Sequence, residues 1–318
     1  MQRIGFYSII TIDRMRAFRS STIWTTAGLA FILGAGLAAI GWQVHPAGAL
    51  VGLGAAGAVA YLGLRRPYQR WKRAQAGLPE DWRMWLRTRV PPYNALDAAG
   101  QQRFERDVLF LMDEFDFEGI RGVTVTDDLR LSVAGAAALL LHGLPDWELP
   151  GTRTVLFYPG HFDDAYDGSR DAGYDGMAHE QGPLIMSAPA VRASWQHPGD
   201  GNNVVLHELA HLFDFDNTGP DGVPSLVDGR SAAVWQQLIR DEMRKVERGT
   251  SILDPYAATA PSEFFAVAVE HFFEEPDAVR TQHPELFEAM TALFNWTPAH
   301  PAEPEPDADP ETLRDDAT

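Results

Sequence analysis

The sequence predicts an α+β protein, mostly helical with a small sheet, preceded by a two-helix transmembrane hairpin. Two charge-free apolar runs stand near the N-terminus, and from residue 78 onward helical spacing alternates with short β-rich segments. The 318 residues leave room for one large domain or two modest ones. The chain has no cysteine, so histidine and carboxylate are its available metal ligands.

The apolar runs cover residues 23–42 and 47–64, with a turn at Pro46 between them. Each is long enough to cross a ~30 Å hydrocarbon layer as a helix. A signal peptide fits less well, because the preceding basic region is long and a second apolar run follows. Buried core helices usually keep a polar face, which these runs lack. We expect a transmembrane hairpin whose glycines let the helices approach closely: Gly28, Gly34, Gly36, Gly52, Gly54 and Gly57.

Basic residues flank both spans. Residues 1–73 carry nine Lys or Arg against Asp13, a charge of +8; the whole chain carries −18, so residues 74–318 carry −26. The positive-inside rule places both termini and the soluble domain in the cytoplasm, at a bacterial-type inner membrane. The acidic body argues against direct nucleic-acid binding.

The expected organisation is a basic N-terminus (1–22), the hairpin with a basic juxtamembrane segment (23–73), one soluble domain (74–296) and a disordered acidic tail (297–318). Within the soluble domain, helices are predicted to start at Pro79 and to cover residues 96–115 and 132–141. Short strands are predicted at Val123 to Val125, at 155–158 and at 183–187. A Gly- and Asp-rich loop covers residues 163–182.

Residues 203–214 contain His207-Glu208-x-x-His211 in an otherwise apolar segment. Histidines four residues apart lie on one helix face, so both imidazoles can bind one metal ion while Glu208 reaches its open side. The alternative is a chance match, because the pattern fixes only three positions. The apolar neighbours favour a metal-hydrolase site, since buried histidines need partners.

A two-histidine site needs a third protein ligand, and a catalytic zinc keeps a fourth position open for water. A helix predicted over 262–271 offers Glu263 in its first turn and Glu270 on the same face two turns later, with Ser262 as a possible cap. Buried acids on an apolar face are costly unless paired or bound to metal. The alternative for Glu263 is that it only complements the helix dipole.

Two further side chains are possible ligands, His271 and Asp214. Asp214 follows His211 by three residues. Its more natural use is to hold a ligand histidine or a backbone group in place.

Two longer segments extend these motifs: Gly-x-Asn-Val-Val-x-His-Glu-x-Ala-His-x-x-Asp at 201–214, and Asp-Pro-Tyr-Ala-Ala-Thr-x-Pro-x-Glu-Phe-Phe-Ala-Val at 254–267. Together with Leu78-Pro79-x-x-Trp82 and Gly182-Pro183-Leu184-Ile185-Met186-Ser187, they resemble the Mlc titration factor A family of glucose-regulated, zinc-dependent, gluzincin-like metallopeptidases. The resemblance covers residues 78 to 295. It implies a zincin-like domain related in its core to anthrax lethal factor.

Position by position, the resemblance implies that His207, His211 and Glu263 bind one zinc ion, that Glu208 is the general base and that Tyr256 assists. Asp214 and Glu270 are then candidates for residues that do not touch the metal but orient its ligands by hydrogen bonding to them. The chain departs from the family pattern at Gly176-Met177-Ala178-His179-Glu180-Gln181, where Gly-Glu-Ala-Trp is usual, and at His271, where a tyrosine is usual. These departures bear on substrate preference rather than on the metal chemistry.

The implied reaction is peptide hydrolysis, in which Glu208 accepts a proton from the attacking water and Tyr256 donates a hydrogen bond to the oxyanion. The alternative for Tyr256 is a buried tyrosine with a satisfied hydroxyl. The strand at 182–187 would border the cleft and pair with an extended peptide.

Three function classes follow from these motifs. The first is a membrane-tethered zinc peptidase acting on peptides or proteins, as an aminopeptidase or an endopeptidase. The second is a binding module that sequesters a transcription repressor. The third is a structural zinc domain, which fits least because structural sites close the fourth metal position.

Overall fold

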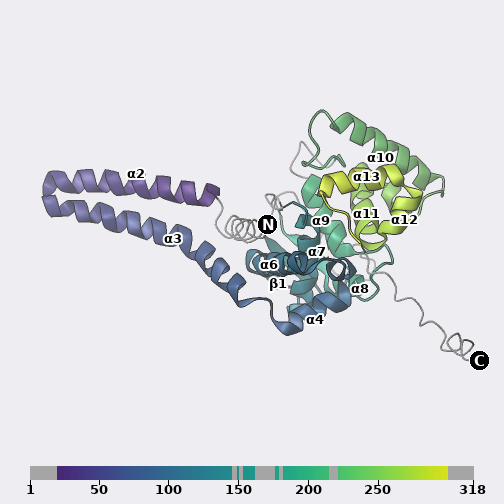
Figure 1. Ribbon diagram of the computed structural model, residues 1–318, viewed down its shortest axis with the longest axis horizontal. Helices are drawn as coiled ribbons and strands as arrows, with labels where there is room; N and C mark the ends of the chain where they lie inside the picture. Colours follow the sequence, from purple (N-terminus) through teal and green to yellow (C-terminus); the bar gives the residue numbers. More distant parts are fainter. Residues whose placement is uncertain are drawn as a thin grey trace, which may run out of the picture.

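The computed structural model describes residues 20–144, 149, 153–161, 176–178, 182–214 and 221–299. Most of the basic N-terminus, most of the loop at 163–182 and the acidic tail from residue 300 lie outside the described residues. A long helical hairpin projects from a mostly helical globular part (Figure 1). The structure confirms two apolar N-terminal helices and a helical domain with a small sheet.

The hairpin consists of α2 (Ser20–Val44), the 3-10 turn η1 (Pro46–Gly48) and α3 (Ala49–Ala76). Its helices meet through small residues: a Cβ on Gly52 would lie 2.2 Å from the Gly34 carbonyl oxygen, and one on Gly48 would lie 2.3 Å from that of Gly41. The expectation is wrong for the other four glycines, since a Cβ there would meet nothing within 4 Å: Gly28, Gly36, Gly54 and Gly57. In the most apolar 18 residues of Ile23–Val44 and of Pro46–Arg65, only 11% and 6% of the residues are buried, unlike the core helices of a soluble domain. By length and composition, both stretches can cross a membrane.

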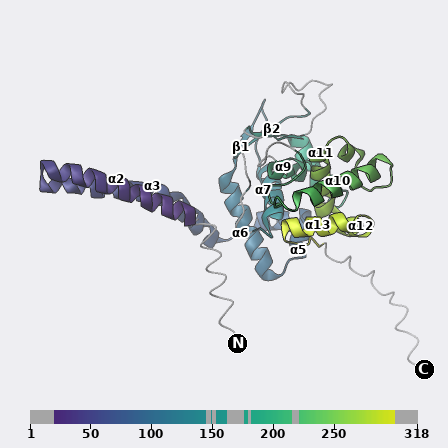
Figure 2. The ribbon, with the colours of Figure 1, turned by 90° about the horizontal axis from the view of Figure 1, so that it is seen from above.

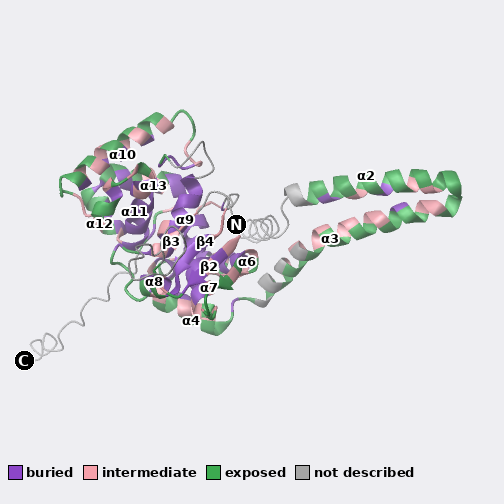
Figure 3. Ribbon diagram, turned by 180° about the vertical axis from the view of Figure 1, so that it is seen from behind, coloured by how far each residue is buried: buried purple, intermediate pink, exposed green. Residues whose placement is uncertain are grey.

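The large apolar side chains of the hairpin point outward, which leaves its surface exposed along its length (Figure 3). Beyond the apolar part, α3 reaches the domain and contacts α6 (Ala98–Glu114). The views in Figures 1 and 2 agree that α10 and α12 lie on the side of the domain away from the hairpin.

The other helices of the domain are α4 (Glu80–Arg89), α5 (Pro91–Asn94), α7 (Asp127–Leu141), α8 (Ala188–Ser194), α9 (Val204–Asp214), α10 (Ala232–Glu247), η2 (Pro255–Ala258), α11 (Pro261–Glu274), α12 (Pro276–Gln282) and α13 (Pro284–Phe294). The three predicted helices correspond to α4, α6 and α7. Asp97 begins α6 by accepting the Gly100 N–H at 2.7 Å. The Ala- and Leu-rich part of α7 is buried, as its composition predicts.

The sheet has the order β1-β2-β4-β3, with β1 (Asp116–Gly119), β2 (Thr154–Tyr158), β3 (Gly176–Met177) and β4 (Leu184–Ser187). The β1–β2 and β2–β4 pairs are parallel, and the short β3 pairs antiparallel with β4. The predicted strands at 155–158 and 183–187 are confirmed as β2 and β4. Because β4 lies between β2 and β3, both of its edges are paired, so the expectation that it binds an extended peptide is wrong.

The strand predicted at Val123 to Val125 is also wrong. The first strand comes earlier, at Asp116–Gly119, and the chain then turns through Arg121 and Gly122, both at positive φ. Val123 and Val125 are partly buried against the core, so their apolar character reflects packing of a connecting segment rather than strand pairing.

The core of the domain is built around α9 and α11, which pack against each other, with α7 also against α9. Nearly every apolar residue of α9 is buried, including Leu206 and Phe213, and α11 contributes four buried phenylalanines: Phe264, Phe265, Phe272 and Phe273. Each fully buried side chain of this size stabilises the fold by about 1.5–3 kcal/mol. This packing fixes the two helices that carry the predicted ligands.

Candidate metal centre

Three predicted ligands converge where α9 meets the first turn of α11. One ligand atom each from His207, His211 and Glu263 lies within 4.8 Å of the others. Glu263 Oε2 is 3.1 Å from His207 Nε2 and 3.6 Å from His211 Nε2. Two imidazoles and one carboxylate at this spacing form a donor set that fits a divalent metal such as zinc.

The start of α11 explains how Glu263 reaches the histidines. Pro261 is the first helical residue, and its fixed φ begins the helix at that point. Ser262 therefore lies inside the first turn and does not cap the helix, contrary to expectation; the residue at the cap position is Ala260. Glu263 follows in the same turn and faces α9.

Glu270 holds His207 from the side away from Glu263. His207 Nδ1 donates to Glu270 Oε1 at 2.8 Å, while Glu270 Oε2 accepts the Asn203 N–H at 2.6 Å. The Glu270 side chain is buried, and this contact directs His207 Nε2 towards Glu263. Glu270, one of the two residues expected to hold the ligands in place, therefore makes a hydrogen bond with a predicted ligand histidine.

Two polar residues that sequence reasoning missed complete this contact. Asn203 is fully buried, caps α9 through a 3.2 Å bond from the Leu206 N–H to its Oδ1, and donates from Nδ2 to Glu274 Oε1 at 2.9 Å. Glu274, one turn after Glu270, also accepts the Gly199 N–H. Burial raises the pKa of Glu274 to about 7, against the opposing effect of these two hydrogen bonds.

The charges of the cluster favour a protonated His207 between two carboxylates. Burial lowers the pKa of His207, but its hydrogen bonds to Glu263 and Glu270 outweigh burial and raise that pKa to about 10. For Glu263 the effects have the opposite sign. Burial raises its pKa, but the hydrogen bonds from both histidines outweigh burial and hold the pKa of Glu263 well below its ordinary value. The carboxylates thus attract positive charge, whether a proton or a metal ion.

Glu208 lies beside the cluster without a hydrogen-bond partner for its Oε2 among the described residues. Its side chain is 95% buried, and burial raises its pKa. Strand β3 covers it: a Cβ on Gly176 would lie only 2.3 Å from Glu208 Oε1, so glycine is the residue that fits there. A buried carboxylate oxygen that no protein group satisfies marks Glu208 as a candidate catalytic group.

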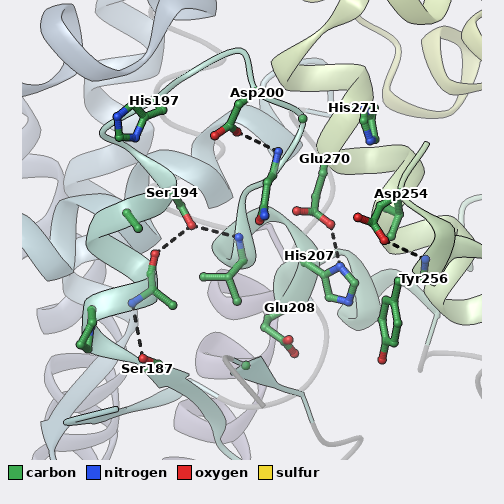
Figure 4. A pocket seen from close by; sticks show the side chains of 18 of the residues that line it. Ser187, Ser194, His197, Asp200, His207, Glu208, Asp254, Tyr256, Glu270 and His271 are labelled. Carbon is green, nitrogen blue, oxygen red and sulfur yellow. Dashed lines mark hydrogen bonds and ion pairs between the residues drawn. The ribbon is translucent and has the colours of Figure 1, made fainter. Parts of the chain in front are cut away.

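Tyr256 lies on η2, with its ring centroid 6.1 Å from that of His207. It is 47% exposed, so the alternative of a buried tyrosine is wrong. Asp254 accepts the Tyr256 N–H at 2.7 Å and thereby caps η2. Tyr256 and His207 are neighbours in the close view of the pocket (Figure 4).

Asp214 holds a backbone group, one of its two expected uses. It is fully buried, and its Oδ2 accepts the Gly222 N–H at 3.0 Å. Burial raises the pKa of Asp214 to about 6. Gly222 lies directly against the Pro261 carbonyl at the start of α11, so Asp214 links the end of α9 to the turn that carries Glu263.

His271, the other alternative ligand, is not part of the cluster; its Nδ1 pairs with Glu275 Oε2 at 2.9 Å. A pocket of about 1050 Å³ opens beside the cluster. Its walls include the α8 residues Ala190 and Ser194, the segment before α9, and the side chains of His207, Glu208 and Tyr256.

Residues 65–295 match the model of a protein family described as glucose-regulated metallopeptidase M90. The chain belongs to this family. Membership of the M90 family indicates a metallopeptidase-like protein that binds a metal. His207, His211 and Glu263 form a cluster that could hold this metal. The matched region contains all of these residues and excludes most of the apolar hairpin.

Similar proteins agree with M90 membership. Mlc titration factor A of Yersinia pestis is 29% identical over 246 residues, which cover 72% of this chain and 89% of that protein. A protein of Synechocystis is 27% identical over 263 residues, covering 76% of this chain and 94% of its own length. The resemblance seen in the sequence is therefore confirmed.

Proposed function

We propose that the protein is a membrane-tethered, gluzincin-like zinc peptidase whose zincin-like catalytic domain covers residues 74–296. His207, His211 and Glu263 hold one zinc ion, Glu208 is the general base and Tyr256 supports the oxyanion. The observation that carries this proposal is the convergence of the three ligand atoms beside the buried, unpartnered Glu208 oxygen. Glu270 orients His207, and Asp214 anchors the turn that carries Glu263.

The residues divide the reaction between them. When bound, zinc in such a site lowers the pKa of a water ligand to about 7 and polarises a carbonyl oxygen. Glu208 accepts the proton of the attacking water and passes it to the leaving amine. The Tyr256 hydroxyl donates to the oxygen that gains charge as the carbonyl is attacked.

A peptide-library digest by the purified full-length protein in detergent tests this proposal. We expect one zinc per chain by mass spectrometry of metal content, cleavage of peptides, and loss of cleavage in a chelator. The cut positions within each peptide distinguish an aminopeptidase from an endopeptidase. Absence of cleavage by the zinc-loaded protein across the library would contradict the proposal.

The tether is proposed from the two exposed apolar helices and the flanking basic residues. We place it in a bacterial-type inner membrane, with the basic N-terminus (1–22), the catalytic domain and the acidic tail (297–318) in the cytoplasm. Reporter fusions at the C-terminus test the orientation. We expect activity from a cytoplasmic reporter; activity from a reporter that functions only outside the cytoplasm would contradict the orientation.

The names of several relatives support a second candidate, a regulatory binding module. Those relatives are called Mlc titration factor A, so this chain would capture a transcription repressor or another protein at the membrane, without contacting DNA. A Glu263→Ala variant separates the two functions. If it loses zinc and peptide cleavage but captures its partner with full biological effect, binding rather than proteolysis is the function.

A further inference from the structure

The pocket beside Glu208 is strongly acidic. Four carboxylates line it: Asp200, Glu208, Asp254 and Glu270. No lysine or arginine lines it among the residues that the structure describes. The arginine of the α8 wall, Arg192, pairs instead with Asp128 of α7, at 3.6 Å between Nε and Oδ2.

A bound metal does not neutralise this charge. With Glu263, five carboxylates surround the pocket and the ligand cluster, and a divalent cation offsets two of them. Three negative charges remain when all five carboxylates are ionised and the lining histidines are neutral. In a concave, partly desolvated site, such an excess attracts cations and repels acidic ligands.

Two of the carboxylates are placed to meet a ligand. Asp254 and Asp200 are exposed, and each uses Oδ1 to accept a backbone N–H, from Tyr256 at 2.7 Å and from Asn202 at 3.0 Å. These bonds fix the side chains at the pocket, with Asp254 beside Tyr256 and Asp200 between His197 and His271 (Figure 4). Glu270, by contrast, is occupied by His207 and Asn203.

Glu208 marks the part of the pocket where the reacting bond of a ligand would lie. The Glu208 side chain lines it, 95% buried and with an unpartnered oxygen. The volume of about 1050 Å³ lies just above the range of about 300–1,000 Å³ typical of small-molecule sites, so the pocket accommodates several residues of a polypeptide.

We propose that this pocket selects polypeptide segments that carry a lysine or arginine close to the bond presented to Glu208, with the cation held by Asp254 and Asp200. This specificity rests on the proposed peptidase function and names its substrate class. An acidic segment is disfavoured because it adds like charge to the three carboxylates that the metal leaves unbalanced.

Binding of matched peptides tests this specificity. The protein is the full-length Glu208→Gln variant, loaded with zinc, in which two of the three unbalanced negative charges remain. A neutral detergent ensures that no anionic lipid attracts the peptides. Two labelled decapeptides differ only by lysine or glutamine at two positions, and fluorescence polarisation gives their Kd. We expect the lysine peptide to bind about tenfold more tightly in 50 mM salt, and this ratio to shrink in 500 mM salt.

Substitutions locate the charges responsible. Asp254→Asn and Asp200→Asn, each added to the Glu208→Gln protein, keep the Oδ1 acceptor and lower the ratio by about two- to fivefold each. Asp277→Asn, which removes one exposed charge from α12 outside the pocket, leaves the ratio unchanged. Equal affinity for both peptides, or an undiminished ratio in the Asp200→Asn, Asp254→Asn double variant, overturns the proposed specificity.

This experiment is independent of turnover. Tighter lysine-peptide binding together with no cleavage by the wild-type protein supports the acidic pocket and contradicts the peptidase. Cleavage of both peptides with equal kcat/KM, and equal binding, contradicts the specificity and leaves the peptidase standing.

Discussion

Glu270 Oε1 lies 2.8 Å from His207 Nδ1, while the other ring nitrogen of His207 lies 3.1 Å from Glu263 Oε2. The imidazole is thus held between a carboxylate that orients it and a carboxylate that shares its proposed metal. Both glutamates come from α11, so the docking of α11 on α9 sets the geometry of the whole site.

Replacing Glu270 with glutamine should weaken zinc binding by about 10- to 100-fold, because the ring of His207 loses its charged partner. Competition with a fluorescent chelator measures this change. Glu275→Gln is a matched control, since Glu275 is on the same stretch of chain and also pairs with a histidine, His271, outside the cluster. Equal zinc affinity of Glu270→Gln and wild type would show that Glu270 does not support the metal.

Replacing Gly176 with alanine should reduce kcat/KM by about 100-fold, because its Cβ would displace either β3 or the Glu208 carboxylate. Zinc content should stay at one per chain, since the three atoms that the new Cβ would meet first all belong to Glu208. Gly160→Ala is the control: Gly160 also lines the pocket, but a Cβ there meets nothing within 4 Å. Full activity of Gly176→Ala would mean that Glu208 is not the base in this position.

Replacing Tyr256 with phenylalanine should lower kcat by about two to three orders of magnitude, as loss of one oxyanion donor typically does. KM, zinc content and melting temperature should change little, because the ring is half exposed and its packing is kept. A variant that loses zinc or stability instead would assign Tyr256 a structural role.

The buried pair between Glu242 and His283 should make stability depend on pH. Burial raises the pKa of Glu242, but hydrogen bonds from His283 and Lys245 outweigh it and lower that pKa below its ordinary value. A lowered carboxylate pKa stabilises the fold above the unfolded value of about 4.3, and this contribution is lost as pH falls through the folded value.

Glu242→Gln should therefore destabilise the protein by about 3–5 kcal/mol at pH 7, as breaking a buried pair does, with the difference from wild type shrinking below about pH 4. Urea unfolding across this range measures it. Asp241→Asn, on the adjacent exposed position, should change stability by less than about 0.5 kcal/mol. A Glu242→Gln effect that is as large at about pH 2 as at pH 7 would exclude an ionised pair.

The site shows which features a sequence reveals. His207, Glu208 and His211 were predictable because one helix fixes their relative placement within four residues. Glu263 stood out as a buried acid on an apolar face, although its meeting with α9 required a tertiary contact. Asn203 and Glu274 were missed because a helix cap and one more surface-type acid are common, and only their mutual contact distinguishes them.

The sheet shows the opposite case. β2 and β4 are apolar and were predicted, whereas β1 reads Asp-Phe-Glu-Gly and β3 spans only Gly176 and Met177. Neither of these has a pattern of its own. β1 forms because β2, from a distant part of the chain, supplies its hydrogen-bond partners, and β3 forms because β4, which follows it closely in the chain, does the same. No local periodicity records either pairing.

The role of Glu208 tests the whole account most directly. In the full-length Glu208→Gln protein, zinc content and peptide hydrolysis are measured on the same sample. We expect one zinc per chain, as in wild type, and a kcat lowered by about two to four orders of magnitude, the range expected for loss of a general base. A Glu208→Gln protein that holds zinc and cleaves peptides at the wild-type rate would contradict this expectation.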